Sequence, residues 1–224
     1  KNADLTTAGK LTIATDSPAY EPWFADDDPS NGKGFEGAVA YAVADKLGFA
    51  KADVTWVVAG FNQAVQPGAK TFDFDINQFS ITEERQKAVD FSSPYYSAAQ
   101  AVIVRNDSEF GKAASLADLA DAKIGAQVGT TSLKAVTQIN PDAKPLVYDD
   151  TSKAAQALAN KQVDAIVADL PSAFYLVAAE LEDARIVGQF QPQTGQSEEF
   201  GLLLAKGSKY TECASLAVDA LKAD

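Results

Sequence analysis

The chain has 224 residues, of which 46% are hydrophobic and 22% are charged, so it can bury one large core or two small ones. Its formal net charge of −12 argues against nucleic acid or an anionic membrane as a partner. It has no histidine and one cysteine, Cys213, which excludes an intrachain disulfide and effectively excludes a zinc site and a Cys–His or Ser–His catalytic pair.

The chain starts at Lys1 and has no methionine, so we expect a processed form that has lost an initiator and any export signal. No apolar run is long enough to predict a membrane span. We expect Cys213 to be a small buried residue on the last helix, with a partner outside these residues as the alternative. Asp26 to Asp28 lack the spaced ligands of a calcium loop and are interpreted as a solvated turn.

The first part of the chain predicts a β-α-β-α-β unit. Strands are expected at residues 11–15, 54–58 and 72–76, and helices at residues 37–47 and 62–66. A proline-rich loop follows the first strand and carries Tyr20, Trp23 and Phe24, which we expect to be exposed.

Residues 80–96 place Arg85 in the first turn of a helix that follows an apolar strand. Thr82 suits the N-cap of that helix. A cation is unfavourable at the positive end of a helix, so we expect a negative group to face Arg85. That group is either Glu84 or Asp90 on a solvated face, or a ligand carboxylate held by two parallel hydrogen bonds.

The second part of the chain repeats the alternation. Strands are expected at residues 123–128, 145–148 and 163–168, and helices from residue 129, at 152–161 and from Pro171, as the first helical residue, to about 182. Alternating strands and helices predict parallel sheets covered on both faces, and two such runs predict two lobes.

Two extended stretches, residues 97–105 and 199–205, are expected to carry the chain from one lobe to the other and back. The predicted lobes are residues 1–97 with 198–224, and residues 98–197. A chain that crosses twice forms a two-stranded hinge, which favours closure by bending.

In open α/β sheets, ligands bind beyond the carboxyl ends of the strands. The groups at such ends are Asp16, Asn77 to Ser80, Thr130 with Thr131, and Asp169, which we expect to line one cleft. Thr130 and Thr131 either bind an anion or only cap their helix, and Asp169 can likewise be only a helix cap.

Four blocks of sequence carry a resemblance. They are Ser-Ile-Thr-Glu-Glu-Arg with Val-Asp-Phe-Ser-Ser-Pro-Tyr-Tyr, Gly-Phe-Glu-Gly, Ser-Leu-Ala-Asp-Leu with Lys-Ile-Gly-Ala-Gln-Val-Gly-Thr-Thr, and Val-Asp-Ala-Ile-Val-Ala-Asp. Over nearly its whole length the chain resembles an extracytoplasmic (periplasmic-type) polar amino-acid-binding protein of an ABC importer, solute-binding protein family 3. The resemblance implies an α/β, two-lobed periplasmic-binding-protein type II fold. Each lobe would be a mostly parallel sheet flanked by helices, and a two-stranded hinge would join them.

The resemblance also implies roles for individual residues. Arg85 matches the arginine that binds the ligand α-carboxylate, helped by Ser80 and by Thr131. Asp169 matches the carboxylate that binds the α-ammonium, supported by Gln78.

Other matching positions concern the ligand side chain. Tyr20 or Trp23, with Phe61, match aromatic residues that flank it, and Asp16 and Glu36 match positions that face a polar or basic side chain in some relatives. For Trp23, Phe61 and Glu36, ordinary packing or a charge at the rim is the alternative.

Two departures from the family pattern bear on the ligand and on the chain end. Asn77-Gln78-Phe79 is bulkier and more polar than the small residues usual there, which leaves the ligand's identity open. The chain ends at Asp224, roughly a helix earlier than relatives, so we expect a trimmed or unusual C-terminus.

The sequence therefore predicts a monomeric solute-binding protein that captures one free amino acid, polar or basic, between its lobes and delivers it to an ABC transporter membrane permease. It would act in the periplasm or at the cell surface, with a lipid anchor left open, and without catalysis, cofactor or metal. One alternative is a dehydratase of a small carboxylic acid with Asp16 or Glu36 as general acid. The other is the ligand-sensing ectodomain of a receptor.

Overall fold

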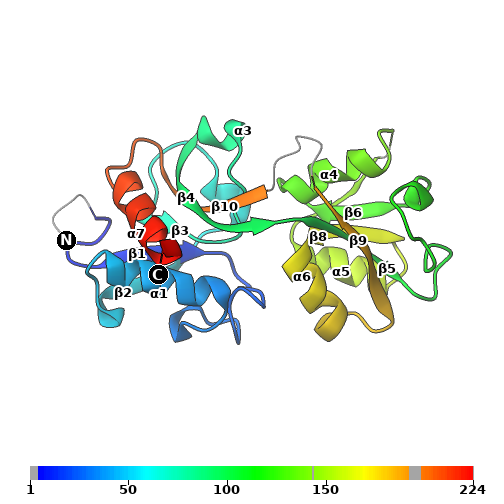
Figure 1. The fold of residues 1–224 in the computed structure, drawn as a ribbon, viewed down its shortest axis with the longest axis horizontal. Coiled ribbons are helices and arrows are strands. Elements are labelled where there is room, and N and C mark those ends of the chain that lie inside the picture. Colours follow the sequence, from blue (N-terminus) through cyan, green and yellow to red (C-terminus); the bar gives the residue numbers. More distant parts are fainter. Residues whose placement is uncertain (1–4, 143, 192–197, 224) are drawn as a thin grey trace. The chain divides into compact units, whose positions relative to one another are not determined.

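The computed structural model describes residues 5–142, 144–191 and 198–223, which form two compact units. Unit 1 comprises Lys1–Ser97 and Glu199–Asp224, and unit 2 comprises Ala98–Glu198. Each unit contains one five-stranded sheet with helices packed on it (Figure 1). Unit 2 includes Glu198, whose carboxylate accepts a hydrogen bond from Gln100.

Unit 1 is built on a sheet with the strand order β2-β1-β3-β10-β4. Strand β1 is parallel to both β2 and β3, and β10 is antiparallel to β3. The strands are β1 (Leu11–Thr15), β2 (Val54–Val58), β3 (Phe74–Asp75), β4 (Val89–Ala98) and β10 (Glu198–Ala205). The helices are α1 (Phe35–Lys46), α2 (Phe61–Ala64), α3 (Glu83–Gln86) and α7 (Thr211–Ala223), with 3-10 turns at Pro29–Asn31 and Lys51–Asp53.

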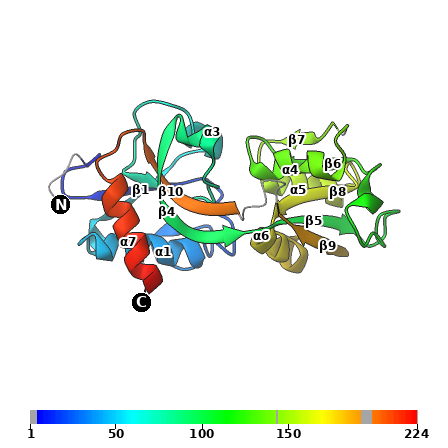
Figure 2. The ribbon, with the colours of Figure 1, turned by 45° about the horizontal axis from the view of Figure 1, so that its top comes forward.

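Strand β1 forms the buried centre of unit 1. All five residues of β1 are buried, as expected for a parallel strand that has neighbours on both sides and layers on both faces. Helix α1 starts after Gly34, whose φ is 84° and where a Cβ would clash with the Trp23 carbonyl oxygen. Helices α1 and α7 pack together and lie side by side in both views (Figures 1 and 2).

The proline-rich loop after β1 folds into the core of unit 1. Trp23 and Phe24 are each only 1% exposed, so the prediction that they are exposed is wrong. The Trp23 ring packs edge-on against the rings of Phe35, Tyr96 and Phe200, with centroid distances of 6.0, 5.2 and 5.7 Å. Burial of these large apolar rings outweighs the local preference of a proline-rich loop for solvent. The packing alternative for Trp23 is therefore the one that the structure supports.

Unit 2 is built on a sheet with the strand order β7-β6-β8-β5-β9. Strand β6 is parallel to β7 and β8, and β5 is antiparallel to β8 and β9. The strands are β5 (Gln100–Arg105), β6 (Ile124–Gln127), β7 (Leu146–Tyr148), β8 (Ala165–Asp169) and β9 (Ala184–Phe190). The helices are α4 (Thr131–Ile139), α5 (Thr151–Ala159) and α6 (Leu170–Tyr175), which continues into a π-helical turn at Leu176–Glu180, and a 3-10 turn lies at Ala117–Leu119.

Strand β5 shows why the sheet of unit 2 is covered on both faces. Ala101 and Ile103 belong to one apolar core, and Val102 and Val104 belong to another. Because successive strand residues point to opposite faces, both cores need helices over them. Helices α5 and α6 contribute to the first core and α4 contributes to the second. Two sheets flanked by helices confirm the predicted α/β fold class.

One strand was missed, and two local expectations were wrong. Strand β9 was not predicted, because Arg185, Gly188 and Gln189 interrupt the apolar pattern of this edge strand. Pro171 is the second helical residue of α6, since Leu170 precedes it. Cys213 is exposed because it lies on the outer face of α7, whose buried residues are Ala214, Ala217 and Val218. No helix in the described part of the chain is long and apolar enough to span a membrane.

Two buried aspartates near β3 differ in how their carboxylates are stabilised. Asp73 accepts backbone hydrogen bonds from Thr6 at 2.8 Å and from Thr12 at 2.7 Å. Neither oxygen of Asp75 has a hydrogen-bond partner among the described residues. Desolvation, together with the charge of Glu36, raises the pKa of Asp75 well above its usual value.

We expect Asp73→Asn to lower the free energy of unfolding by about 1 to 3 kcal/mol, because one backbone N–H loses its charged acceptor. We expect Asp75→Asn to leave that free energy unchanged or higher at about pH 8, because the cost of a buried carboxylate disappears. Urea unfolding of both variants measures the difference. If Asp75→Asn were the more destabilising change, this account of the two carboxylates would be wrong.

Candidate functional site

Arg85 is held in place by three contacts within unit 1. The backbone N–H of Arg85 donates to Thr82 Oγ1 at 3.2 Å, which confirms Thr82 as the N-cap of α3. Its Nη1 donates to the Ser80 carbonyl oxygen at 2.7 Å, and its Cζ lies 5.2 Å from the centroid of the Phe61 ring. A guanidinium fixed by a hydrogen bond at one edge and a ring on one face has a defined plane, as binding of a carboxylate requires.

Phe61 connects Arg85 to the first strand of unit 1. Its ring stacks on Phe79 with a centroid distance of 4.7 Å, and both rings are buried. The backbone N–H of Phe61 donates to Asp16 Oδ2 at 3.0 Å, and Oδ1 of Asp16 accepts from Ser17 N–H at 2.8 Å. The structure therefore links Asp16, Phe61 and Arg85, and it gives Asp16 the local role of receiving the first N–H of α2.

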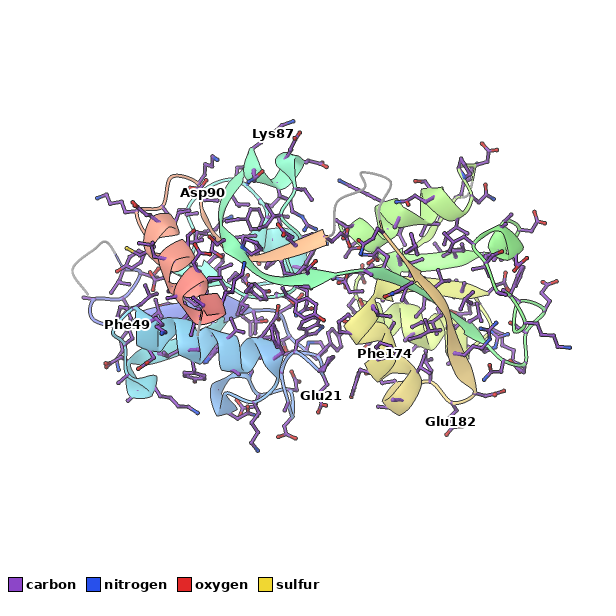
Figure 3. All side chains as sticks on the ribbon, in the orientation of Figure 1. Glu21, Phe49, Lys87, Asp90, Phe174 and Glu182 are labelled. Atoms are coloured by element: carbon purple, nitrogen blue, oxygen red, sulfur yellow. The ribbon has the colours of Figure 1, made fainter. Side chains whose placement is uncertain are left out.

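One of the two local partners predicted for Arg85 is engaged elsewhere. Asp90, labelled in Figure 3, forms an ion pair with Lys206 at 2.9 Å. Its other oxygen accepts from the Gly207 N–H at 2.8 Å. Asp90 thus serves to tie β4 to the segment that follows β10.

Glu36 lies in the first turn of α1 and is 0% exposed, so the interpretation of a charge at the rim is wrong. Its Oε1 accepts from the Gln78 backbone N–H at 2.8 Å and from the Tyr95 hydroxyl, and its Oε2 accepts from Gln78 Nε2. Burial raises the pKa of Glu36 from 4.5 to about 7, although the hydrogen bonds from Tyr95 and Gln78 oppose this shift. The carboxylate therefore organises a buried network that includes a predicted ligand-binding residue.

The loop at residues 77–80 has a conformation that its neighbours enforce. Gln78 has a φ of 46°, which a residue with a side chain adopts only under constraint. Asn77 and Ser80 are buried, and Ser80 forms an antiparallel bridge with Phe200 of β10. Tyr20, the remaining predicted residue of unit 1, is half-buried, and its carbonyl oxygen accepts from the backbone N–H groups of the turn that follows it.

In unit 2, the start of α4 carries the two predicted threonines. Thr130 is the N-cap, and its Oγ1 accepts from the Leu133 N–H at 3.1 Å and donates to the Gln127 carbonyl oxygen at 2.7 Å. The capping role of Thr130 is therefore confirmed. Thr131 is the first residue of α4, at the helix end that favours negative groups.

Asp169 ends β8 and precedes α6, but its side chain makes no capping hydrogen bond. Its Oδ1 instead accepts from Gln100 Nε2 at 2.9 Å, and the same Nε2 donates to Oε2 of Glu198. Gln100 is 0% exposed and Glu198 is buried. One neutral amide group of Gln100 therefore orients both carboxylates.

The sequence did not predict Tyr95, Gln100 or Glu198 as part of these sites. A glutamine placed directly before four apolar residues of a strand was a signal for a buried polar role of Gln100. Among the described residues, no group of three or more acidic or cysteine side chains is placed to hold a metal ion. Asp27 and Asp28 accept from the backbone N–H groups of Ala19 and Ser30, consistent with the predicted turn.

Comparisons with known proteins identify the family of the chain. Residues 11–170 match the model of the bacterial extracellular solute-binding proteins, family 3. A probable histidine-binding protein of Campylobacter jejuni is 28% identical over 225 residues, which cover 99% of this chain and 83% of that protein. An arginine-binding periplasmic protein of Mannheimia haemolytica is 28% identical over 168 residues, which cover 75% of this chain and 66% of that protein.

Solved structures are similar over almost the whole chain. An ancestral arginine-binding protein bound to arginine has a TM-score of 0.79 at 32% identity, covering 96% of this chain and 93% of that one. An ancestral amino-acid-binding protein, AncCDT-1, described as a precursor of cyclohexadienyl dehydratase, has a TM-score of 0.78 at 30% identity, covering 96% and 90%.

The raised pKa of Glu36 gives a prediction for stability against pH. Between pH 4.5 and about 7, the unfolded chain releases a proton that the folded protein keeps. The proton on Glu36 therefore stabilises the folded protein fully below pH 4.5, and this stabilisation is lost as the pH rises through about 7. It adds roughly 3 kcal/mol at most to the free energy of unfolding.

We expect the parent protein to lose more stability between about pH 5 and about pH 8 than Glu36→Gln, because the glutamine does not titrate. Urea unfolding of both proteins at the two pH values measures the difference. Parallel pH profiles would show that Glu36 titrates normally.

Proposed function

Because the chain belongs to the bacterial extracellular solute-binding proteins, family 3, we propose that it binds one free amino acid outside the cytoplasm and delivers it to the membrane permease of an ABC transporter. The observation that carries this proposal is a pair of charged groups of opposite sign, each already oriented by its own unit. Arg85 in unit 1 would bind the α-carboxylate of the ligand, and Asp169 in unit 2 would bind its α-ammonium.

The support for Arg85 is its fixed geometry. The Ser80 carbonyl oxygen and the Phe61 ring orient the guanidinium. A preoriented group loses less conformational entropy on binding than a flexible one. Two parallel hydrogen bonds to a carboxylate then supply both affinity and direction.

The support for Asp169 is its position at the end of β8, where Gln100 Nε2 donates a hydrogen bond to its carboxylate. One amide donor serves two carboxylates, those of Asp169 and Glu198. A carboxylate oriented in this way would accept hydrogen bonds from an ammonium group. Thr131, at the first position of α4, would add a contact to the ligand carboxylate.

We propose a ligand with a polar or basic side chain. Relatives are named for binding histidine, arginine, cystine and glutamine, all of which carry polar side chains. In unit 1, Asn77, Gln78 and Asp16 would provide the hydrogen bonds, and Phe61 with Tyr20 would provide aromatic contact. This proposal does not depend on whether the protein is a monomer or carries a lipid anchor.

A second candidate function is acid-catalysed dehydration of a small carboxylic acid. The pKa of about 7 for Glu36 favours it, since a general acid works best with a pKa near the working pH. However, the Glu36 carboxylate is fully buried and already accepts hydrogen bonds from Gln78 and Tyr95, so it is poorly placed to protonate a substrate. Product formation from such an acid would favour this second candidate.

The test uses protein that has been unfolded and refolded to remove any ligand carried through purification. We expect one amino acid, or a few related ones, to raise the melting temperature. A ligand at a hundred times its Kd adds about 2.7 kcal/mol, or a shift of roughly 5 to 10 °C. If none of the twenty amino acids shifts the melting temperature, the proposal is wrong.

The same ligand then tests Arg85. We expect Arg85→Ala to weaken binding more than about a hundredfold in calorimetry, because a ligand carboxylate would be left unpaired. Arg105→Ala is the matched control, since it removes an arginine that pairs with Asp107 in unit 2 and should bind within a few-fold of the parent. Equal affinities for Arg85→Ala and the parent would remove Arg85 from the site.

A further inference from the structure

We infer that Glu36 is a positioning residue that fixes the orientation of the Gln78 amide and thereby selects ligands whose side chains donate hydrogen bonds. This inference rests on the proposed function, because it concerns the side chain of the bound amino acid. Glu36 itself is fully buried and would not touch the ligand.

The carboxylate of Glu36 distinguishes the two ends of the Gln78 amide. An ionised carboxylate only accepts hydrogen bonds, so it must face the Nε2 end of a glutamine and not the Oε1 end. Glu36 Oε2 accepts from Gln78 Nε2, while Glu36 Oε1 accepts from the Gln78 backbone N–H at 2.8 Å. One carboxylate thus holds both the main chain and the side chain of the same residue.

The backbone conformation of Gln78 is one that its contacts with Glu36 help to maintain. Its φ of 46° is unfavourable for a residue with a side chain, so the surrounding contacts must maintain it. The Tyr95 hydroxyl donates to the same Glu36 oxygen that binds the Gln78 N–H, which fixes the carboxylate in turn.

The orientation decides which groups of Gln78 face away from Glu36. With the backbone N–H and Nε2 bound to Glu36, the side-chain oxygen and the backbone carbonyl point elsewhere, and both are acceptors. Burial is the largest cause of the raised pKa of Asp75, and the charges of Glu36 and Asp16 raise it further, so this part of unit 1 has several acidic groups. A ligand group that carries N–H donors, above all a cationic one, matches this environment, and a carboxylate does not.

The first variant, Glu36→Gln, should reverse the preference for ligand side chains that donate hydrogen bonds. The new amide at position 36 would place an NH₂ group where Glu36 Oε2 lies, so the Gln78 amide would have to turn its oxygen inward and its NH₂ group outward. Calorimetry with L-arginine, L-glutamine and L-glutamate is done at about pH 8, above the pKa of about 7 of Glu36. We expect affinity for L-arginine, relative to L-glutamate and L-glutamine, to fall about tenfold.

The second variant, Glu36→Gln with Gln78→Glu, exchanges the two side chains and keeps the net charge. The amide at position 36 would now accept from the backbone N–H of position 78 and donate to its carboxylate, whose outer oxygen is again an acceptor. We expect the ratio of affinities to return to within about threefold of the parent ratio. A role in general folding alone would not produce this recovery.

Asp73→Asn is the matched control. It changes another buried carboxylate of unit 1 to an amide, at a residue that binds Thr6 and Thr12 and not Gln78. We expect this variant to melt at a lower temperature but to keep the parent ratio of affinities. If Glu36→Gln leaves that ratio unchanged as well, the inference is overturned.

A measurement without ligand separates failure of this inference from failure of the proposed function. Gln78→Glu alone places two carboxylates together and should lower the melting temperature at about pH 8. Adding Glu36→Gln should raise it again by roughly 5 °C, beyond the effect of Glu36→Gln alone. If the effects of the two substitutions on the melting temperature simply add, the positioning role of Glu36 is overturned. If the two substitutions are coupled in this way but the parent protein binds no amino acid, the positioning role is confirmed and the proposed function is refuted.

Discussion

A charge that leaves water must be paired or hydrogen-bonded, and the polar interiors of both units depend on how this is done. Asp73 meets the requirement with two backbone N–H groups, and Glu36 meets it with the backbone and side chain of Gln78 and with Tyr95. Asp75 meets it with a raised pKa instead. The hydrogen bonds of Asp73 and Glu36 connect distant segments of unit 1, whereas Asp75 makes no such connection among the described residues.

The same constraint explains why the proposed ligand is a zwitterion. Arg85 has a guanidinium oriented by a carbonyl oxygen and by an aromatic ring, and Asp169 shares a single neutral donor with Glu198. A free amino acid carries one charge of each sign, which is the pair of charges that the proposed roles of Arg85 and Asp169 require. In the proposed site, Glu36 would add a further level of selection, because it would set the polarity that Gln78 presents to the ligand side chain.

Much of the fold was readable from local sequence. Strands β1 and β2 lie at the predicted residues because short apolar runs end at clear breaks, and Thr82 caps α3 as its position suggests. Trp23 was misjudged because the rings that bury it come from distant segments. The partners of Asp169 and Glu198 were missed for the same reason, since Gln100 lies 69 and 98 residues from them in the chain. The rule on strand ends drew attention to Asp169, and only tertiary structure shows that Gln100 orients its carboxylate.

The central claim is that the protein recognises both charges of a free amino acid. The most direct test is calorimetry of the refolded protein with an amino acid that binds, with its decarboxylated amine and with its N-acetyl derivative. The account predicts that each modified ligand binds at least about a hundredfold more weakly, because either Arg85 or Asp169 would lose its partner. If either derivative bound within a few-fold of the amino acid, recognition of the zwitterion by these two residues would be contradicted.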